Sequence, residues 1–278
     1  MLAAFRAEYT CGEGPSTPFY LQTSPEFAMK RLLASDVGSI FQITKAFRNG
    51  EVGRHHNPEF TLLEWYRVGF DLSALQDEVA ELLLRLAAIF DFELSVQRSS
   101  YLELFQGHLG LHPLDSDLGD FSDLALERGL CDASALCGND RALWLDFLFS
   151  CLIQPAMSQD CLLMVNRYPA LLPSLARRST DDPRWVERVE LFINGLELGN
   201  GFHELTDPVE QESRFRADLD YRARLGFALP DLDDRLLAAL ANGLPNCSGI
   251  AIGLDRLLMV LLRAQRIEEV LSFSFEDA

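Results

Sequence analysis

The chain has 278 residues, of which 48% are hydrophobic and 24% charged, a composition typical of a globular protein with a sizeable core. It contains no stretch of about 18 apolar residues, which argues against a membrane-spanning helix. The formal net charge of −18 argues against a protein whose main function is to bind nucleic acid. The negative charge either serves only to keep the protein soluble or indicates a preference for cationic ligands.

Six cysteines are spread along the chain without a C-x-x-C pair. This spacing carries no zinc signature and indicates reduced thiols. The first ten residues lack the long apolar segment of a signal peptide. A cytoplasmic location is therefore expected.

Two alternating segments lie between residues 39 and 66. The first, 39–48, has a largely apolar face and a polar face that ends at Arg48. The second, 59–66, has one face made of Phe60, Leu62, Glu64 and Tyr66. The pattern predicts antiparallel strands, joined by a long charged loop over residues 49–58 of the kind that often carries function.

The middle of the chain is mainly helical in pattern. Residues 73–90 form an amphipathic helix, for which Ser73 and Gln76 are predicted to make a capping box. Residues 99–156 are predicted to be short helices that form an insertion, and residues 161–168 to be a buried strand.

The last third returns to strands. Asn194-Gly195 predicts a type I′ turn between strands over residues 186–193 and 196–205. A helix is predicted from Asp207 to Gly226, and an apolar segment over residues 247–253 runs into another helix. Strand pairs with interspersed helices favour an α+β fold, with an antiparallel sheet flanked by helices.

Three places carry residue types suited to chemistry. Arg48, at a strand end, is suited to a phosphate, although most such arginines are merely solvated. Glu197 and Glu204 flank a Gly-Asn-Gly stretch and could hold Mg²⁺ or an ammonium group, provided that a bulge at residues 199–201 turns both to one side; otherwise they are surface acids. Arg256, after Gly253 and in the first turn of a helix, suits an anion or simply pairs with an acid. The adjacent His55 and His56 do not form a metal site.

Together these segments resemble the catalytic domain of class II lysyl-tRNA synthetases. The segment Phe47–Tyr66 is similar to motif 2, Gly249–Arg256 to motif 3, and Glu197–Asp207 to the lysine signature between them. Within that superfamily, the chain resembles the family of stand-alone ligases that attach (R)-β-lysine to elongation factor P. This closer resemblance is carried by Thr23–Leu33, by Glu64-Trp65-Tyr66, by Cys247–Gly253 and by Ser272–Ser274.

The resemblance implies one catalytic domain over residues 1–278, with no anticodon-binding domain. Family members form homodimers through motif 1, and the chain begins too late to contain that motif. The expected substrates are ATP with Mg²⁺ and (R)-β-lysine or lysine, and the expected partner is elongation factor P rather than tRNA. The amino acid would form an aminoacyl-adenylate, which a lysine amine of elongation factor P then attacks.

By motif matching, the resemblance also implies residue roles. Arg48 and Arg256 are the expected catalytic residues, acting on the α- and γ-phosphates. The other expected ATP-binding residues are Asn49, Gly50, Asn57, Glu197, Leu198 and Gly253. The expected amino acid site consists of Ser24, Pro25, Glu26, Tyr66, Glu204 and Ala251. Glu197 and Glu204 are the expected Mg²⁺ ligands. Gly50 stands where the family usually has an acid, so a side-chain contact to adenine is lost there.

Two alternatives remain open on the sequence. One is an adenylate-forming ligase that uses α-lysine or another acceptor. The other is a catalytically silent protein that binds a partner or ligand, an alternative favoured by Gly50 and by the lack of motif 1.

Overall fold

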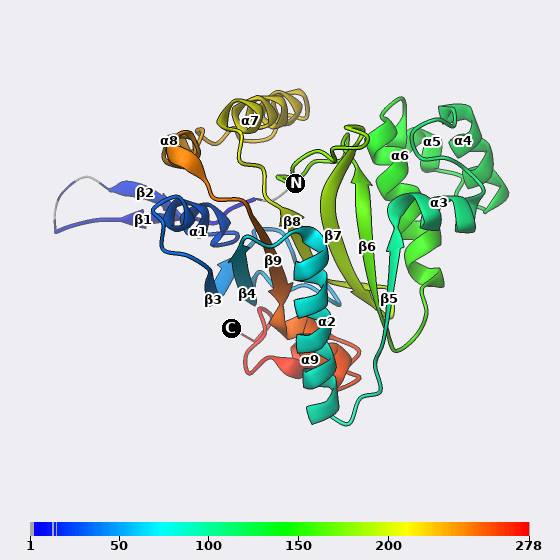
Figure 1. Cartoon of the computed structure of the whole chain (residues 1–278), viewed down its shortest axis with the longest axis horizontal. Coiled ribbons are helices and arrows are strands. Elements are labelled where there is room, and N and C mark those ends of the chain that lie inside the picture. Colours follow the sequence, from blue (N-terminus) through cyan, green and yellow to red (C-terminus); the bar gives the residue numbers. More distant parts are fainter. Residues whose placement is uncertain (1–2, 13, 15, 278) are drawn as a thin grey trace. The chain divides into compact units, whose positions relative to one another are not determined.

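The computed structural model describes residues 3–12, 14 and 16–277 (Figure 1). It divides into two compact units, here called unit 1 (Met1–Phe70 with Thr206–Ala278) and unit 2 (Asp71–Leu205). Each unit combines strands with helices, which confirms the α+β fold class. In the part of the chain that is described, no helix combines the length and apolar character needed to cross a bilayer.

Unit 1 is built around the antiparallel strands β3 (Ile40–Phe47), β4 (Glu59–Val68) and β9 (Cys247–Gly253). β4 lies between the other two and pairs with both. The pair β3–β4 confirms the antiparallel strands predicted on either side of the long loop. A separate hairpin, β1 (Arg6–Tyr9) and β2 (Thr17–Tyr20), extends from this unit in Figure 1.

The apolar face of β3 is exposed in the described chain. Phe41 and Ile43 show 74% and 59% of their surface to solvent, whereas Ala46 on the opposite face is fully buried. The predicted alternation is therefore present, but its apolar side does not pack on the core of unit 1. Exposed apolar faces of this kind mark surfaces for contact with other molecules.

Five helices make up the rest of the regular structure described in unit 1. They are α1 (Glu26–Leu33), α7 (Pro208–Arg224), α8 (Asp234–Gly243), α9 (Leu254–Leu261) and the short 3₁₀ helix η3 (Ile267–Val270). Helices α1 and α8 lie side by side in Figure 1 and pack together. The core that they share with the strands contains Met29, Leu33, Tyr66, Leu236, Leu240, Leu244 and Cys247.

Helix α7 begins and ends as the sequence predicts. The side chain of Asp207 accepts hydrogen bonds from the backbone N–H groups of Val209 and Glu210, and Pro208 occupies the first helical position. Gly226, with a φ of +73°, follows the last turn.

Unit 2 contains four described strands: β5 (Ser95–Ser100), β6 (Cys161–Pro169), β7 (Trp185–Ile193) and β8 (Leu196–His203). β5 lies parallel to β6, whereas β6 pairs with β7, and β7 with β8, in antiparallel fashion. The turn at Asn194 and Gly195 has φ values of 56° and 73°, as a type I′ turn requires.

The predicted helical insertion is present in unit 2. It consists of α3 (Tyr101–Leu109), α4 (Leu118–Glu127), α5 (Ala133–Cys137), α6 (Arg141–Leu148), η1 (Phe149–Ile153) and η2 (Gln154–Ala156). In Figure 1, α3 to α6 gather beside β5 and β6. Their core is largely aromatic and includes Tyr101, Phe105, Phe121, Trp144, Phe149 and Phe192.

The predicted capping box of the first long helix is wrong. Helix α2 spans Leu72–Ile89, and its N-cap is Asp71, whose side chain accepts a 2.8 Å hydrogen bond from Ala74 N–H. Ser73 therefore lies inside the first turn instead of at the cap. Aspartate is as good an N-cap as serine, and both occur here within three residues, so the pattern alone did not separate them.

Candidate active site

The register of β4 and β9 brings together residues that were predicted to bind substrates. Residues directly opposite each other in antiparallel strands share a face of the sheet. The opposed pairs on this face are Leu62–Gly253, Glu64–Ala251 and Tyr66–Gly249. Because β9 contributes nothing larger than a methyl group here, its backbone is open to close approach by a ligand.

Glu64 is the carboxylate at the centre of this face, and only 2% of its surface is exposed. Ser24 Oγ donates a 2.9 Å hydrogen bond to Glu64 Oε2, and the Tyr66 hydroxyl donates one of 2.7 Å to Glu64 Oε1. Both carboxylate oxygens are thus held in a fixed direction.

A second acid and a lysine adjoin Glu64. Lys30 is 1% exposed, and its Nζ lies 2.6 Å from Glu26 Oε1, one helical turn away on α1. Ser24 Oγ accepts a 3.0 Å hydrogen bond from the backbone N–H of Glu26. These hydrogen bonds and the ion pair connect five residues, here called the acidic cluster: Ser24, Glu26, Lys30, Glu64 and Tyr66.

The pKa of Glu64 is raised from its ordinary value of 4.5 to about 7. Burial is the largest cause, and the negative charge of Glu26 adds to it. The hydrogen bonds from Tyr66 and Ser24 and the charge of Lys30 work in the opposite direction. The neutral and ionised forms are thus nearly balanced at neutral pH, and a cation bound beside the carboxylate would favour the ionised form.

Of the predicted amino acid site, Ser24, Glu26 and Tyr66 meet in the acidic cluster. Pro25 is the N-cap residue of α1, and its carbonyl accepts a hydrogen bond from Met29 N–H. Ala251 lies opposite Glu64, as described above, and Glu204 belongs to unit 2. Sequence reasoning missed Glu64 and Lys30, although the alternation already placed Glu64 on the same face as Tyr66.

Arg48 follows β3 on the predicted polar face. Its guanidinium carbon lies 4.9 Å from the centre of the Phe60 ring, and its Nη1 lies 3.7 Å from Glu51 Oε2. Nε donates a long hydrogen bond of 3.4 Å to the carbonyl of Thr23. The aromatic ring holds the guanidinium plane, and the side chain stays 27% exposed and so within reach of an anion.

The loop after Arg48 contains three of the predicted ATP-binding residues. Asn49 is exposed, and Gly50 has a φ of +84°, a left-handed conformation that suits glycine. The side chain of Asn57 donates to the carbonyl of Glu59 and accepts a hydrogen bond from Phe275 N–H. The amide group of Asn57 thus fastens the carboxyl-terminal segment to the loop.

Arg256 in the first turn of α9 is also joined to this loop. Its Nε donates to the carbonyl of His55 at 3.1 Å, and its Nη2 lies 2.5 Å from Nε2 of His56. Burial, together with the adjacent Arg256 charge, lowers the pKa of His56, so the ring is neutral at pH 7 and accepts the hydrogen bond. The two histidines, for which no metal role was predicted, therefore orient the second predicted catalytic arginine.

In unit 2, a β-bulge lies next to Glu197, the first of the two predicted Mg²⁺ ligands. The register of β7 and β8 shifts so that Leu198 is an extra residue between Glu197 and Gly199. Strict alternation would turn Glu197 and Glu204 to opposite faces, and one inserted residue removes this obstacle to a shared face. Glu204 itself directly follows the last residue of β8. The bulge was predicted at residues 199–201; it lies at Leu198 instead.

Arg188 on β7 lies close to Glu197 and was missed by the sequence reasoning. Its Nε donates a 3.0 Å hydrogen bond to Asn200 Oδ1, and its Nη2 pairs with Glu190. Burial opposes the charge of Arg188, but nearby negative groups, led by Glu190 and including Glu197, outweigh it and raise the pKa. Glu197 therefore lies in a charged network and is not a solvated surface acid.

Glu197 on β8 and Glu204, the first residue after β8, fit a magnesium ion that arrives with a nucleotide. Mg²⁺ in such sites is usually held by one or two carboxylates plus the phosphates of the substrate. Within the described residues there is no cluster of three or more His, Cys, Asp or Glu side chains that could hold a metal by itself. A pair of carboxylates therefore matches this donor set.

Comparison with known proteins identifies the family. The chain belongs to the tRNA synthetases of class II (D, K and N), whose family model matches residues 7–277. Among curated proteins it is similar to those called elongation factor P–(R)-beta-lysine ligase. That of Sodalis glossinidius is 43% identical over 273 residues, which cover 97% of this chain and 82% of the relative.

Two further relatives of the same name give similar values. The protein of Pectobacterium atrosepticum is 45% identical over 267 residues, covering 96% of this chain and 81% of the relative. That of Vibrio cholerae is 43% identical over 281 residues, covering 100% of this chain and 84% of the relative. The resemblance to class II enzymes and to stand-alone β-lysine ligases is thereby confirmed.

Proposed function

We propose that this chain is an ATP-dependent ligase that joins (R)-β-lysine to a lysine side chain of elongation factor P. Membership of the class II synthetases supports the use of ATP, and the name shared by its relatives supports the two substrates. The observation that carries the proposal is the buried Glu64, held by Ser24 and Tyr66 on the same strand face as Ala251. Such a carboxylate is suited to an amino group of the substrate.

The reaction needs no covalent bond to the protein. A carboxylate oxygen of the amino acid attacks the α-phosphorus of ATP, the bond to the β-phosphate oxygen breaks, and pyrophosphate leaves. The neutral amine of the acceptor lysine then attacks the carbonyl carbon of the adenylate, loses a proton and displaces AMP. Catalysis by the chain consists of positioning and of charge stabilisation.

Each residue role follows from charge and orientation. Arg48, held by Phe60, would neutralise charge on the α-phosphate as the carboxylate attacks, and Arg256, held by His55 and His56, would hold the γ-phosphate. The other residues proposed to bind ATP are Asn49, Gly50, Asn57, Leu198 and Gly253.

The remaining roles concern the metal and the amino acid. Glu197 and Glu204 would hold Mg²⁺, which neutralises phosphate charge when it is bound. The acidic cluster would hold one amino group of the substrate, with Pro25 and Ala251 shaping the site.

We further infer that the acceptor is a protein rather than tRNA, that the chain works as a homodimer and that it acts in the cytoplasm. The net charge of −18 supports the first inference, since gripping tRNA would need a basic surface. The exposed Phe41 and Ile43 on β3 support self-association. None of the six cysteines, all of which lie in the described residues, forms a disulfide, which fits a reducing compartment.

The deciding experiment is ATP–pyrophosphate exchange with (R)-β-lysine and with α-lysine, followed by mass spectrometry of elongation factor P and a tRNA-charging assay. We expect exchange with (R)-β-lysine and a mass increase of elongation factor P equal to one β-lysyl group. Charged tRNA beside an unmodified factor would contradict the proposed acceptor. A lack of exchange with every lysine isomer would favour a catalytically silent binding protein.

A further inference from the structure

The buried lysine of the acidic cluster calls for a physical reason. Lys30 is 1% exposed, although lysine is almost never buried unless it is paired, because removing an ammonium group from water is costly. The pair with Glu26 has the i,i+4 spacing that stabilises helices. That benefit is available on an exposed helix face, and an apolar residue would fill a buried position at less cost. Stability of α1 therefore does not account for the burial.

The positive charge of Lys30 interacts electrostatically with Glu64. It lowers the pKa of that carboxyl and so opposes the effects of burial and of Glu26. Among the described residues, the titratable or charged groups with the largest effects on Glu64 are Glu26 and Lys30 from α1 and Tyr66 from β4. The neighbours opposite Glu64 in the sheet, Gln42 on β3 and Ala251 on β9, are uncharged. The cluster thus holds two carboxylates and one ammonium group.

We propose that Lys30 is a positioning residue for the substrate: its buried ammonium fixes the Glu26 carboxylate and leaves the acidic cluster with one net negative charge, so that the cluster accepts one substrate amino group beside Glu64. This inference rests on the proposed function and deepens it. Lys30 touches no reacting atom. It acts through Glu26 and through the charge state of Glu64, which receives the substrate cation.

The test follows kcat/KM for (R)-β-lysine in ATP–pyrophosphate exchange from about pH 5.5 to about pH 9 in the wild-type enzyme and in Lys30→Met. Without Lys30, the charge of Glu26 acts on the buried Glu64 with no ammonium group to oppose it, so Glu64 keeps its proton to a higher pH. The rise of kcat/KM with pH is expected to move upward by about one unit. At about pH 6, kcat/KM then falls roughly tenfold, and at about pH 9 it recovers to within about twofold of the wild type.

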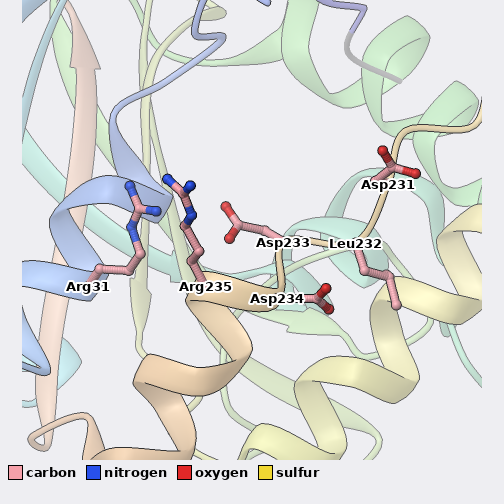
Figure 2. Close-up of a pocket in the computed structure, with 6 residues that line it drawn as sticks. All are labelled: Arg31, Asp231, Leu232, Asp233, Asp234 and Arg235. Atoms are coloured by element: carbon pink, nitrogen blue, oxygen red, sulfur yellow. The ribbon is translucent and has the colours of Figure 1, made fainter.

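Two single variants serve as controls. Lys30→Arg keeps the charge and is expected to keep the wild-type pH midpoint. Arg31→Met also removes one positive charge from α1, but Arg31 lines a surface depression of about 440 Å³ together with Arg235 and Asp233. Figure 2 shows Arg31 beside Arg235 at the start of α8. The midpoint of Arg31→Met is therefore expected to equal that of the wild type.

A double variant separates charge from packing. Glu26→Gln/Lys30→Met removes both the group that raises and the group that lowers the pKa of Glu64, so its midpoint is expected to return towards the wild-type value, with a lower kcat/KM throughout. Near-UV circular dichroism checks that each variant is folded.

Three outcomes overturn the inference. An unshifted midpoint in folded Lys30→Met would show that Lys30 acts only in packing. Failure of both the single and the double variant to fold would assign Lys30 to folding alone. An absence of exchange in the wild-type enzyme itself would instead refute the proposed function, and the inference with it.

Discussion

The Tyr66 hydroxyl donates a 2.7 Å hydrogen bond to Oε1 of Glu64, two residues earlier on the same strand. Side chains two positions apart on a strand point to the same face, so β4 supplies both the carboxylate and the group that orients it. β4 also lies between β3 and β9, and both side chains are buried, with 2% and 3% of their surface exposed. The direction of the carboxylate is therefore fixed by strand geometry and does not depend on a loop closing.

Glu64→Gln is expected to raise the KM for the amino acid by roughly 10²-fold, because losing one partner of a buried ion pair costs about 2–5 kcal/mol. The KM for ATP should change little, and exchange kinetics with each substrate varied in turn measure both constants. Glu59→Gln is the matched control, since Glu59 lies on the same strand with a side chain that is 52% exposed. Equal increases in both constants would contradict the ammonium role.

The stability of the protein should depend on pH through Glu64. Its pKa is about 7 in the folded chain against an ordinary 4.5, so between these values the folded state binds more protons than the unfolded state. The free energy of unfolding contributed by Glu64 therefore falls as pH rises through this window, by about 1–3 kcal/mol. Urea unfolding at both ends of the window measures the change. Glu64→Gln should remove this component, and an unchanged pH dependence in the variant would show that Glu64 does not cause it.

Arg48→Ala should slow adenylate formation by roughly 10²-fold or more, the scale observed for losing a key contact to transition-state charge. Pyrophosphate exchange at saturating substrates measures the rate. Lys45→Ala is the control, because Lys45 lies on β3, three residues before Arg48 and so on the opposite face, and its side chain is 50% exposed. A near-normal rate for Arg48→Ala would show that the assignment of motif 2 is wrong.

Gly50→Glu, which places an acid in the loop after Arg48, should destabilise the chain by about 1–2 kcal/mol, because Gly50 has a φ of +84°. No heavy atom beyond its chain neighbours lies within 4 Å of an added Cβ, so backbone strain alone sets the cost. Gly50→Asn should cost less, since asparagine tolerates this conformation. Thermal unfolding compares the two, and equal losses would point to a cause other than φ.

Glu204→Gln should weaken amino acid binding more than ATP binding. Glu204 is 1% exposed, so the exchange of a charged for a neutral group is not screened by water. Exchange kinetics with each substrate varied give the two constants. An equal effect on both would count against a role with the substrate ammonium and would leave only the metal role.

Local signals predicted much of the fold. The alternating segments on either side of residues 49–58 predicted β3 and β4. Asn194-Gly195 predicted the turn between β7 and β8, and Asp207 with Pro208 predicted the start of α7. Each depends on residues close in sequence. The parallel pairing of β5 with β6 was not foreseen, because the two strands are separated by the helical insertion and no local pattern encodes their contact.

The candidate site was predicted only in part, for a similar reason. Sequence motifs identified Arg48, Ser24, Glu26 and Tyr66. In the sequence, Lys30 resembles instead the second residue of an ordinary i,i+4 ion pair with Glu26 on an exposed helix face. Its burial depends on tertiary packing around α1, which no pattern within α1 reveals. The exact position of the bulge at Leu198 likewise depends on pairing with β7. The Gly-Asn-Gly stretch therefore indicated the region of the bulge but not the residue.

The hydrogen bond between Asn57 and Phe275 ties together positions that are 218 residues apart. A second tie joins Ile267 N–H to the carbonyl of Arg54. The loop over residues 49–58 and the carboxyl-terminal segment that contains Ile267 and Phe275 therefore stabilise each other. Cleavage of that segment by a protease would make the loop more mobile. Resistance of that segment to digestion would thus report how firmly the loop is held, without any label near the substrates.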